Sequence, residues 1–328
     1  MDSTYFTCSL DQINESNFED IALKLFSFQY KNNLLYQTYV HHLGKDPGSI
    51  HSIAEIPFLP IRFFKSHAVV CGSWKPEIVF TSSATSGSLV SRHLVPSLDF
   101  YLKNTLSIFQ HFYGSIENYH FLALLPSYLE RSGSSLIAMI DYFIKRDLTG
   151  QSGFYLNNYN NLTEQIDRLK KSEKKIILWG VSFALLDLAE KLEIDLSSCI
   201  VMETGGMKGR RKEWVREELH RYLCKRFNTK WIHSEYGMTE LLSQAYAVGK
   251  GYFQPPSWMQ MRVRDINDPF QELGKGKIGG VNIIDLANSN SCAFIETEDL
   301  GRIVEGSSFE ILGRADNSDI RGCNLLIG

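Results

Sequence analysis

The sequence predicts a mixed α/β fold whose last part is a smaller, β-rich portion. Short buried strands are predicted at Phe121–Leu125, Ile176–Leu178 and Ile200–Met202, and helical patterns separate them, as in βα units. From Met261 onward the pattern changes to short β-prone segments between Gly, Asn and Asp turns. A chain of 328 residues is long enough to form about two such parts.

The remaining elements follow in chain order. Apolar side chains at helical spacing predict helices between residues 17 and 43. Pro57 and Pro60 break any helix over residues 56–70 and predict an extended run there. Further patterns predict helices at Leu98–Tyr113, Ser182–Leu192 and Lys212–Phe227, and strands at Gly279–Leu286, Ala293–Ile295 and Arg302–Val304. We therefore expect an α/β body over residues 1–260 and a β-rich portion over residues 261–328.

Composition excludes several classes of protein. A net charge of −3 gives no general argument for a nucleic-acid partner. The sequence has no apolar stretch long enough for a transmembrane helix, and its acidic start lacks the pattern of a secretory signal. The six cysteines are scattered without a CxxC pair, which argues against a zinc site or a disulfide framework. Together these features predict a cytoplasmic protein.

The segment Phe80–His93, FTSSATSGSLVSRH, is the most informative in the chain. After a β-prone start, Thr81–Gly87 contains only small or hydroxylated residues, which cannot fill a core. Small residues let backbone N–H groups approach a polyanion closely, and the hydroxyls add donors. A phosphate-binding loop and a solvated surface turn both fit this segment. It is not the common P-loop, because the pattern GxxxxGK[ST] is absent.

Three later blocks carry groups that suit a nucleotide. In the block HSEYGMTE, Thr239 can donate to a phosphate oxygen and Glu240 can hold Mg²⁺. In the block TEDLGR, Asp299 can accept hydrogen bonds from a ribose diol. In the block LGRAD, Arg314 can reach a phosphate or the ribose. Taken singly, each block also fits an ordinary turn or a surface charge.

The order of the four blocks resembles the adenylate-forming superfamily, which includes acyl-CoA synthetases and luciferases. FTSSATSG resembles its phosphate loop, EYGMTE its tyrosine–threonine–glutamate motif, TEDLGR its ribose-binding motif and LGRAD its hinge. Within the superfamily the chain is most similar to the LuxE-type acyl-protein synthetases, through IPFLPIRFFKSHAVV, LLPSYLERSGSSLIAM and ETGGMKGRRKE. The resemblance covers the chain from about residue 15 to the end. It implies the large N-terminal domain of this superfamily, without the mobile C-terminal domain of CoA ligases.

The resemblance also implies a set of site residues and the cofactors ATP and Mg²⁺. Thr239 would hold the α-phosphate, Glu240 the metal ion, and Asp299 with Arg314 the ribose, while Tyr236 and Gly237 belong to the same nucleotide-binding motif. The residues expected to hold the β- and γ-phosphates are Ser82, Ser83, Thr85, Ser86 and Gly87, and those expected to line the adenine are Gly205 and Gly206. Two departures from the family pattern stand out: Ala84 replaces a usual glycine, and SLVSRH lacks the lysine that often follows the loop.

The implied reaction activates a carboxylic acid, expected to be a fatty acid, as an acyl adenylate. In acyl-protein synthetases a cysteine near the C-terminus then takes the acyl group and passes it to an acyl reductase. Cys323 in IRGCNLL is the position that resembles this cysteine, and a buried small hydrophobe is the other reading of it. Two alternative functions remain open at this point: a truncated CoA ligase of the phenylacetate type, and a non-catalytic module that binds a nucleotide or an acyl group.

Overall fold

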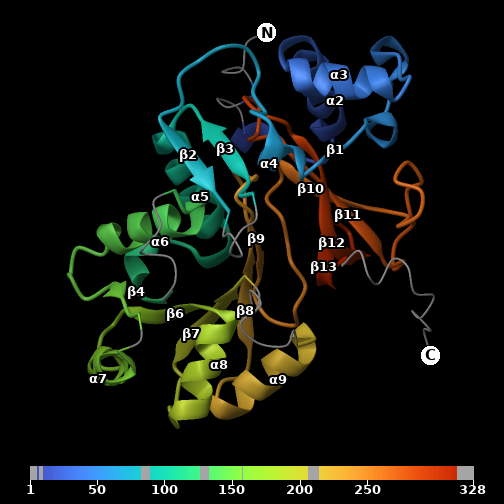
Figure 1. Ribbon diagram of the computed structural model, residues 1–328. Coiled ribbons are helices and arrows are strands. Elements are labelled where there is room, and N and C mark those ends of the chain that lie inside the picture. The colour runs from blue at the N-terminus through green and yellow to red at the C-terminus, as the bar shows by residue number, and fades with distance from the viewer. Residues whose placement is uncertain are drawn as a thin grey trace.

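The computed structural model describes residues 6, 10–82, 89–125, 133–156, 158–205 and 214–315 (Figure 1). Its α-helices are α2 (Phe18–Asn32), α3 (Leu34–His42), α4 (Phe63–Ser66), α5 (Leu98–Tyr113), α6 (Ser135–Arg146), α7 (Tyr159–Leu169), α8 (Ser182–Lys191) and α9 (Arg216–Arg226). Its strands are β1 (Leu59–Pro60), β2 (Ile78–Thr81), β3 (Arg92–Val95), β4 (Tyr119–Leu124), β5 (Gly153–Phe154), β6 (Lys175–Val181), β7 (Cys199–Thr204), β8 (Ile232–Tyr236), β9 (Ala245–Ala247), β10 (Met259–Arg264), β11 (Gly279–Asp285), β12 (Phe294–Glu305) and β13 (Ser308–Arg314).

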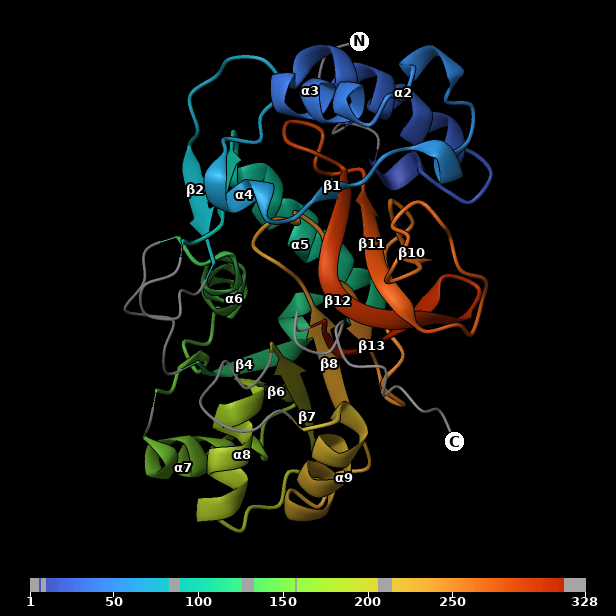
Figure 2. The same ribbon diagram turned by 45° about the vertical axis from the view of Figure 1, so that its right-hand side comes forward.

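A mostly parallel sheet forms the centre of the body, with the strand order β5-β4-β6-β7-β8-β9. Strands β4 to β8 pair in parallel, and β9 runs antiparallel to β8. All six residues of β4 are buried, as expected where helices cover both faces of a parallel sheet. Helices α8 and α9 lie together on one face, and α5 and α6 lie on the other (Figures 1 and 2). The predicted βα units are therefore confirmed.

A second sheet contains the C-terminal strands. Its order is β1-β12-β11-β10, and β13 also pairs with β12. Along β10 the residues Met259, Met261 and Val263 are buried, while their neighbours point to the opposite face. Figure 2 shows α2 and α3 at one end of this sheet. The β-rich portion is present, but β1 joins it from the N-terminal part of the chain, and the boundary at residue 260 stays a prediction.

Two local predictions are corrected. The run 56–70 is not extended throughout, because α4 makes a single helical turn just after Pro60. Proline disfavours the helix only at and before its own position, so the residues that follow it are free to turn. The segments Ala293–Ile295 and Arg302–Val304 are not separate strands, since β12 runs through both. An irregular register at Leu300 and Gly301 replaces the predicted turn.

No helix in the part of the chain that the structure describes is long and apolar enough to cross a membrane.

Candidate functional site

The site is built at the carboxyl edge of the parallel sheet, where β7 and β8 end. Thr204 and Glu235 are register partners on these two strands, so Gly205, which follows β7, lies beside Tyr236, the last residue of β8. Gly205 has a φ of 68°, a conformation that favours glycine. A Cβ atom on Gly237 would clash with Glu235 Oε1. Ligands of open α/β sheets bind at this edge. The predicted residues Gly205 and Gly237 therefore lie where the backbone can approach a ligand closely.

Tyr236, Asp299 and Arg314 form one polar cluster. The Tyr236 hydroxyl donates to Asp299 Oδ2 over 2.8 Å, and Arg314 Nε lies 3.8 Å from Asp299 Oδ1. Asp299 and Arg314 are paired across β12 and β13, so the sheet register sets their spacing. Burial raises the pKa of Asp299, and the Tyr236 hydrogen bond and the Arg314 charge only partly offset it. The structure thus brings together three predicted residues, one from each of the three later blocks.

Thr239 and Glu240 lie in the turn after β8, and β3 holds this turn. His93 Nδ1 is 3.0 Å from the carbonyl oxygen of Thr239. The Ser91 side chain hydrogen-bonds the Glu240 carboxylate, and Asn288 Nδ2 donates to the Glu240 carbonyl oxygen over 2.7 Å. These bonds place Thr239 and Glu240 next to β3. Because β3 follows the predicted phosphate loop in the sequence, the two motifs are linked through this strand.

The Glu240 carboxylate suits a cation. Burial raises its pKa, and no Lys or Arg pairs with it among the described residues. No group of three or more His, Cys, Asp or Glu side chains in that part of the chain has the geometry of a metal site. Magnesium in nucleotide sites usually takes one or two carboxylates together with phosphates and water. Glu240 therefore fits the role of a single protein ligand to Mg²⁺.

Of the other predicted residues, the structure describes Ser82 and Gly205. Ser82 is described, and its hydroxyl accepts a hydrogen bond from the Ser91 N–H over 2.9 Å, which leaves its own proton to donate. The Gly205 carbonyl oxygen accepts from the Ser182 hydroxyl over 2.8 Å. The predicted residues outside the described part of the chain are Ser83, Thr85, Ser86, Gly87, Gly206 and Cys323.

Sequence reasoning missed a buried acidic network beneath this edge. Glu203 at the end of β7 accepts from the Ser182 hydroxyl and lies 3.8 Å from both Arg216 Nη1 and His220 Nε2. Glu235 on β8 accepts from the Thr204 hydroxyl, and burial raises its pKa to about 7. Part of the signal was available, since IVMET places Glu203 directly after the predicted strand Ile200–Met202, where a core residue would be apolar.

The three histidines considered from the sequence divide clearly. His93 is buried between the Thr239 carbonyl and the Ser291 hydroxyl, and burial lowers its pKa to about 4. His233 contacts the Tyr113 hydroxyl through Nδ1 at 3.0 Å, and burial lowers its pKa to about 4 as well. Both histidines are neutral at pH 7, His93 fully buried and His233 half-buried. His67 is exposed beside α4.

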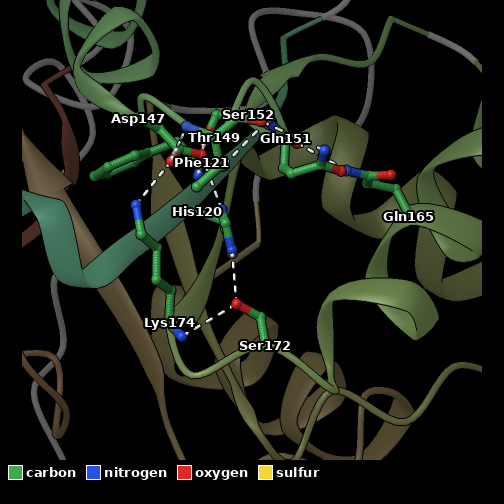
Figure 3. A network of polar contacts seen from close by, with 9 residues as sticks. All are labelled: His120, Phe121, Asp147, Thr149, Gln151, Ser152, Gln165, Ser172 and Lys174. Carbon is green, nitrogen blue, oxygen red and sulfur yellow. Dashed lines mark hydrogen bonds and ion pairs between the residues drawn. The ribbon is translucent and has the colours of Figure 1, made fainter.

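A second buried polar network lies near the amino ends of β4 and β6 (Figure 3). Asp147 is its centre and bonds His120 Nδ1 and Lys174 Nζ, each over 2.8 Å. Ser152 and Thr149 also donate to its two oxygens. These contacts tie the end of α6 to both strands, and they lie at the edge of the sheet opposite Gly205 and Tyr236.

Comparisons with known proteins agree with this architecture. The family model described as "Acyl-protein synthetase, LuxE" matches residues 1–328. The chain is 22% identical over 341 aligned positions to a long-chain-fatty-acid–luciferin-component ligase of Aliivibrio fischeri, covering 94% of this chain and 86% of that protein.

Solved structures of similar fold include a 2-hydroxyisobutyryl-CoA ligase in complex with 2-HIB-AMP and CoA, at 13% identity and a TM-score of 0.68, covering 92% of this chain and 68% of that one. ATP-bound MatB from Rhodopseudomonas palustris matches at 14% identity and a TM-score of 0.53, covering 74% of this chain. The match spans about half of the MatB chain, 49%. At such identities these structures support the fold alone, whereas the family match extends over every residue. The chain therefore belongs to the LuxE family of acyl-protein synthetases, and it is an enzyme, an ATP-dependent ligase of the acyl-adenylate-forming kind.

Proposed function

We propose that this ligase activates a fatty acid with ATP and then carries the acyl group on Cys323 before it passes to an acyl reductase. The observation that carries the nucleotide part is the Asp299 cluster, in which Tyr236, Asp299 and Arg314 meet at the edge of the sheet. The similarity to a ligase named for long-chain fatty acids supports the substrate class. We expect the protein to work in the cytoplasm, where its cysteines stay reduced.

In the proposed site the ribose diol binds the Asp299 carboxylate. Asp299 is held by Tyr236 on one oxygen and faces Arg314 on the other, so its orientation is fixed before the nucleotide arrives. Gly205, with Gly206, would give the adenine a backbone surface free of side chains. Ser82 would donate to the terminal phosphates together with Ser83, Thr85, Ser86 and Gly87.

The chemical step joins two anions. A carboxylate oxygen of the fatty acid attacks the α-phosphorus, the new O–P bond forms, and the bond to the bridging oxygen breaks so that pyrophosphate leaves with the electron pair. Thr239 would donate to an α-phosphate oxygen, and Glu240 would hold Mg²⁺, which neutralises charge on the phosphates. The acyl carbon of the adenylate is then open to attack by the Cys323 thiolate, which forms a thioester and releases AMP.

Exchange of labelled pyrophosphate into ATP tests the adenylation step. We expect exchange that depends on a saturated fatty acid of suitable chain length. Asp299→Ala removes the carboxylate that would accept two hydrogen bonds from the ribose hydroxyls, so it should lower kcat/KM for ATP by roughly 100-fold. Glu305→Ala, an exposed carboxylate on the same strand, is the matched control and should behave like the wild type. Equal losses in both variants, or no exchange with any fatty acid, would contradict the proposal.

Mass spectrometry of the intact protein tests the transfer step. After incubation with ATP and a fatty acid we expect one acyl adduct, cleaved by neutral hydroxylamine as a thioester is. Cys323→Ser should abolish that adduct while pyrophosphate exchange continues. A hydroxylamine-labile adduct that survives in Cys323→Ser would assign the acceptor to another residue.

A further inference from the structure

A small basic pocket lies between α4 and β3, outside the residues assigned above. Its volume is about 140 Å³. Its lining residues are Phe64, Lys65, Ser66, His67, Ala68, Arg92 and Leu94. Three of them carry basic side chains and none is acidic, so the pocket is suited to an anion.

The two permanent charges of this pocket are not neutralised by the described part of the chain. Lys65 and Arg92 are exposed, and neither forms an ion pair with any described carboxylate. Arg62, one turn earlier, shows the contrast, because it pairs with Glu298. A cation that has no carboxylate partner within the protein remains available to a phosphate.

The position of the pocket relates it to the candidate site. Thr81 and Arg92 are register partners, so the Ser/Thr-rich sequence leaves β2 and returns to β3 beside Arg92. Ser91 and His93 face Glu240 and Thr239, and alternation along a strand directs Arg92 and Leu94 to the other side. The pocket is thus one strand away from the carboxylate proposed to hold Mg²⁺. The Lys65 charge also adds to the Arg62 hydrogen bond that lowers the pKa of Glu298, so its field reaches β12.

The proposed adenylation reaction requires positive charge near the leaving pyrophosphate. When the bond between the α-phosphorus and the bridging oxygen breaks, the electron pair moves onto the pyrophosphate, whose negative charge increases. The sequence that follows the Ser/Thr-rich segment, SLVSRH, has no lysine, and Arg92 is its only permanent cation. Cations placed where charge develops stabilise a transition state more than a ground state.

We propose that Lys65 and Arg92 form a subsite for the pyrophosphoryl group, which they hold as part of ATP and again as the leaving pyrophosphate. This inference rests on the proposed adenylation reaction and adds residues from α4 and β3 to it. In it Lys65, on the single turn of α4, adds a second positive charge to that of Arg92.

Steady-state pyrophosphate exchange with Lys65→Met, Arg92→Met and the double variant tests the subsite. We expect the KM for pyrophosphate to rise at least tenfold in each single variant and further in the double variant, with the KM for the fatty acid unchanged. Lys65→Arg should restore most of the pyrophosphate affinity because it restores the charge. Lys225→Met, an exposed lysine on α9, is the control and should match the wild type.

Direct titration calorimetry with magnesium pyrophosphate separates this inference from the proposed function. If the wild type exchanges pyrophosphate but the variants keep its KM for pyrophosphate, the subsite is wrong and adenylation stands. If the wild type shows no exchange, binding of pyrophosphate that is lost in the double variant still supports the anion site. Binding equal in wild type and double variant, or stronger binding of inorganic phosphate than of pyrophosphate, would overturn the subsite.

Discussion

Glu203 and Glu235 lie on adjacent strands and are both buried, yet their environments shift their pKa values in opposite directions. Burial raises the pKa of Glu203, but the Arg216 charge and the hydrogen bonds of His220 and Ser182 outweigh it and hold that pKa below its ordinary value. Glu235 has only the Thr204 hydroxyl to offset burial, and the neighbouring Glu203 charge opposes its ionisation. One carboxyl is thus kept ionised and the other takes up a proton near neutral pH.

The protonation of Glu235 makes stability depend on pH. Its pKa is about 7 in the folded protein and near 4.3 in an unfolded chain, so the folded state binds the proton more tightly. The stabilisation from that proton is complete below about pH 4 and is lost as pH rises through 7. Glu235→Gln keeps an acceptor for Thr204 without this titration. When the pH rises from 5 to 9, the unfolding free energy of the wild type should therefore fall by about 3 kcal/mol more than that of Glu235→Gln.

Urea unfolding across this pH range measures the difference. Glu305→Gln, at an exposed position, is the control and should follow the wild-type profile. Parallel profiles for wild type and Glu235→Gln would contradict the prediction, because they would mean that Glu235 ionises alike in both states.

At the residue scale the sequence pointed to residues that meet in the fold, but not to the contact between them. EYGMTE and TEDLGR identified Tyr236 and Asp299, and the structure places their side chains 2.8 Å apart. That contact depends on how two sheets pack, which no local pattern contains. Glu235 escaped notice for a related reason: its importance lies in burial, and periodicity alone does not distinguish a buried carboxylate from a surface one.

At the scale of elements, β12 shows how a strand can be mistaken for a turn. The residues Glu298-Asp299-Leu300-Gly301 have the composition of a hairpin turn, and they lie between the predicted strands Ala293–Ile295 and Arg302–Val304. In the fold β11 and β13 pair with β12 on either side. The register with β13 shifts between Leu300 and Gly301, and the strand continues through the glycine. A Cβ on Gly301 would meet the Glu310 carbonyl oxygen of β13, so this glycine serves close strand pairing instead of a turn.

The Asp147 network joins three elements, and its charge balance predicts an acid-sensitive connection. Burial alone would raise the pKa of Asp147, but Lys174, Ser152, His120 and Thr149 outweigh it and hold the pKa well below its ordinary value. The stabilisation is therefore present above about pH 4, the unfolded pKa of an aspartate, and is lost as pH falls below it.

Asp147→Asn leaves Lys174 and His120 without their anion. We expect a loss of about 3–5 kcal/mol in unfolding free energy at pH 7, the usual cost of breaking a buried pair. Chemical denaturation at pH 7 and at pH 3.5 measures it, and the difference from wild type should shrink at the lower pH. Asp167→Asn, which breaks an exposed pair with Lys170, is the control and should cost less than 1 kcal/mol. An equally small cost for Asp147→Asn would show that its network adds little stability.

At the scale of the whole molecule, the connection 286–293 between β11 and β12 links distant parts of the chain. Asn288 donates to the Glu240 carbonyl, and the Ser291 hydroxyl contacts His93. On its other side Gln29 of α2 donates to the Asn288 carbonyl over 2.8 Å and accepts from the Ala293 N–H over 2.9 Å. The N-terminal helices, the predicted Mg²⁺ ligand and the second sheet thus share one segment. Composition and periodicity predicted each part but not this connection, because its bonds to Gln29 span more than 250 residues.

The shared segment predicts that the N-terminal helices and the second sheet unfold together. Gln29 is fully buried, and Gln29→Ala would leave the Ala293 N–H without its partner and the Asn288 carbonyl oxygen with only the Ser291 N–H. An unsatisfied buried group costs about 1–3 kcal/mol, so we expect a loss of about 1–3 kcal/mol in global stability. Native-state hydrogen exchange should show faster exchange in α2 and in β12 by the same factor.

Gln37→Ala on α3 gives the matched comparison. Its side chain is partly exposed, and among the described residues it makes no side-chain hydrogen bond, so the exchange of both elements should stay at the wild-type rate. Because Asn288 also holds the turn that carries Glu240, Gln29→Ala should raise the KM for ATP as well, although α2 contributes nothing to the predicted nucleotide site. Faster exchange in α2 alone, with β12 still protected as in the wild type, would mean that the helices form a separate unit and that the division of the chain near residue 260 has to be redrawn around them.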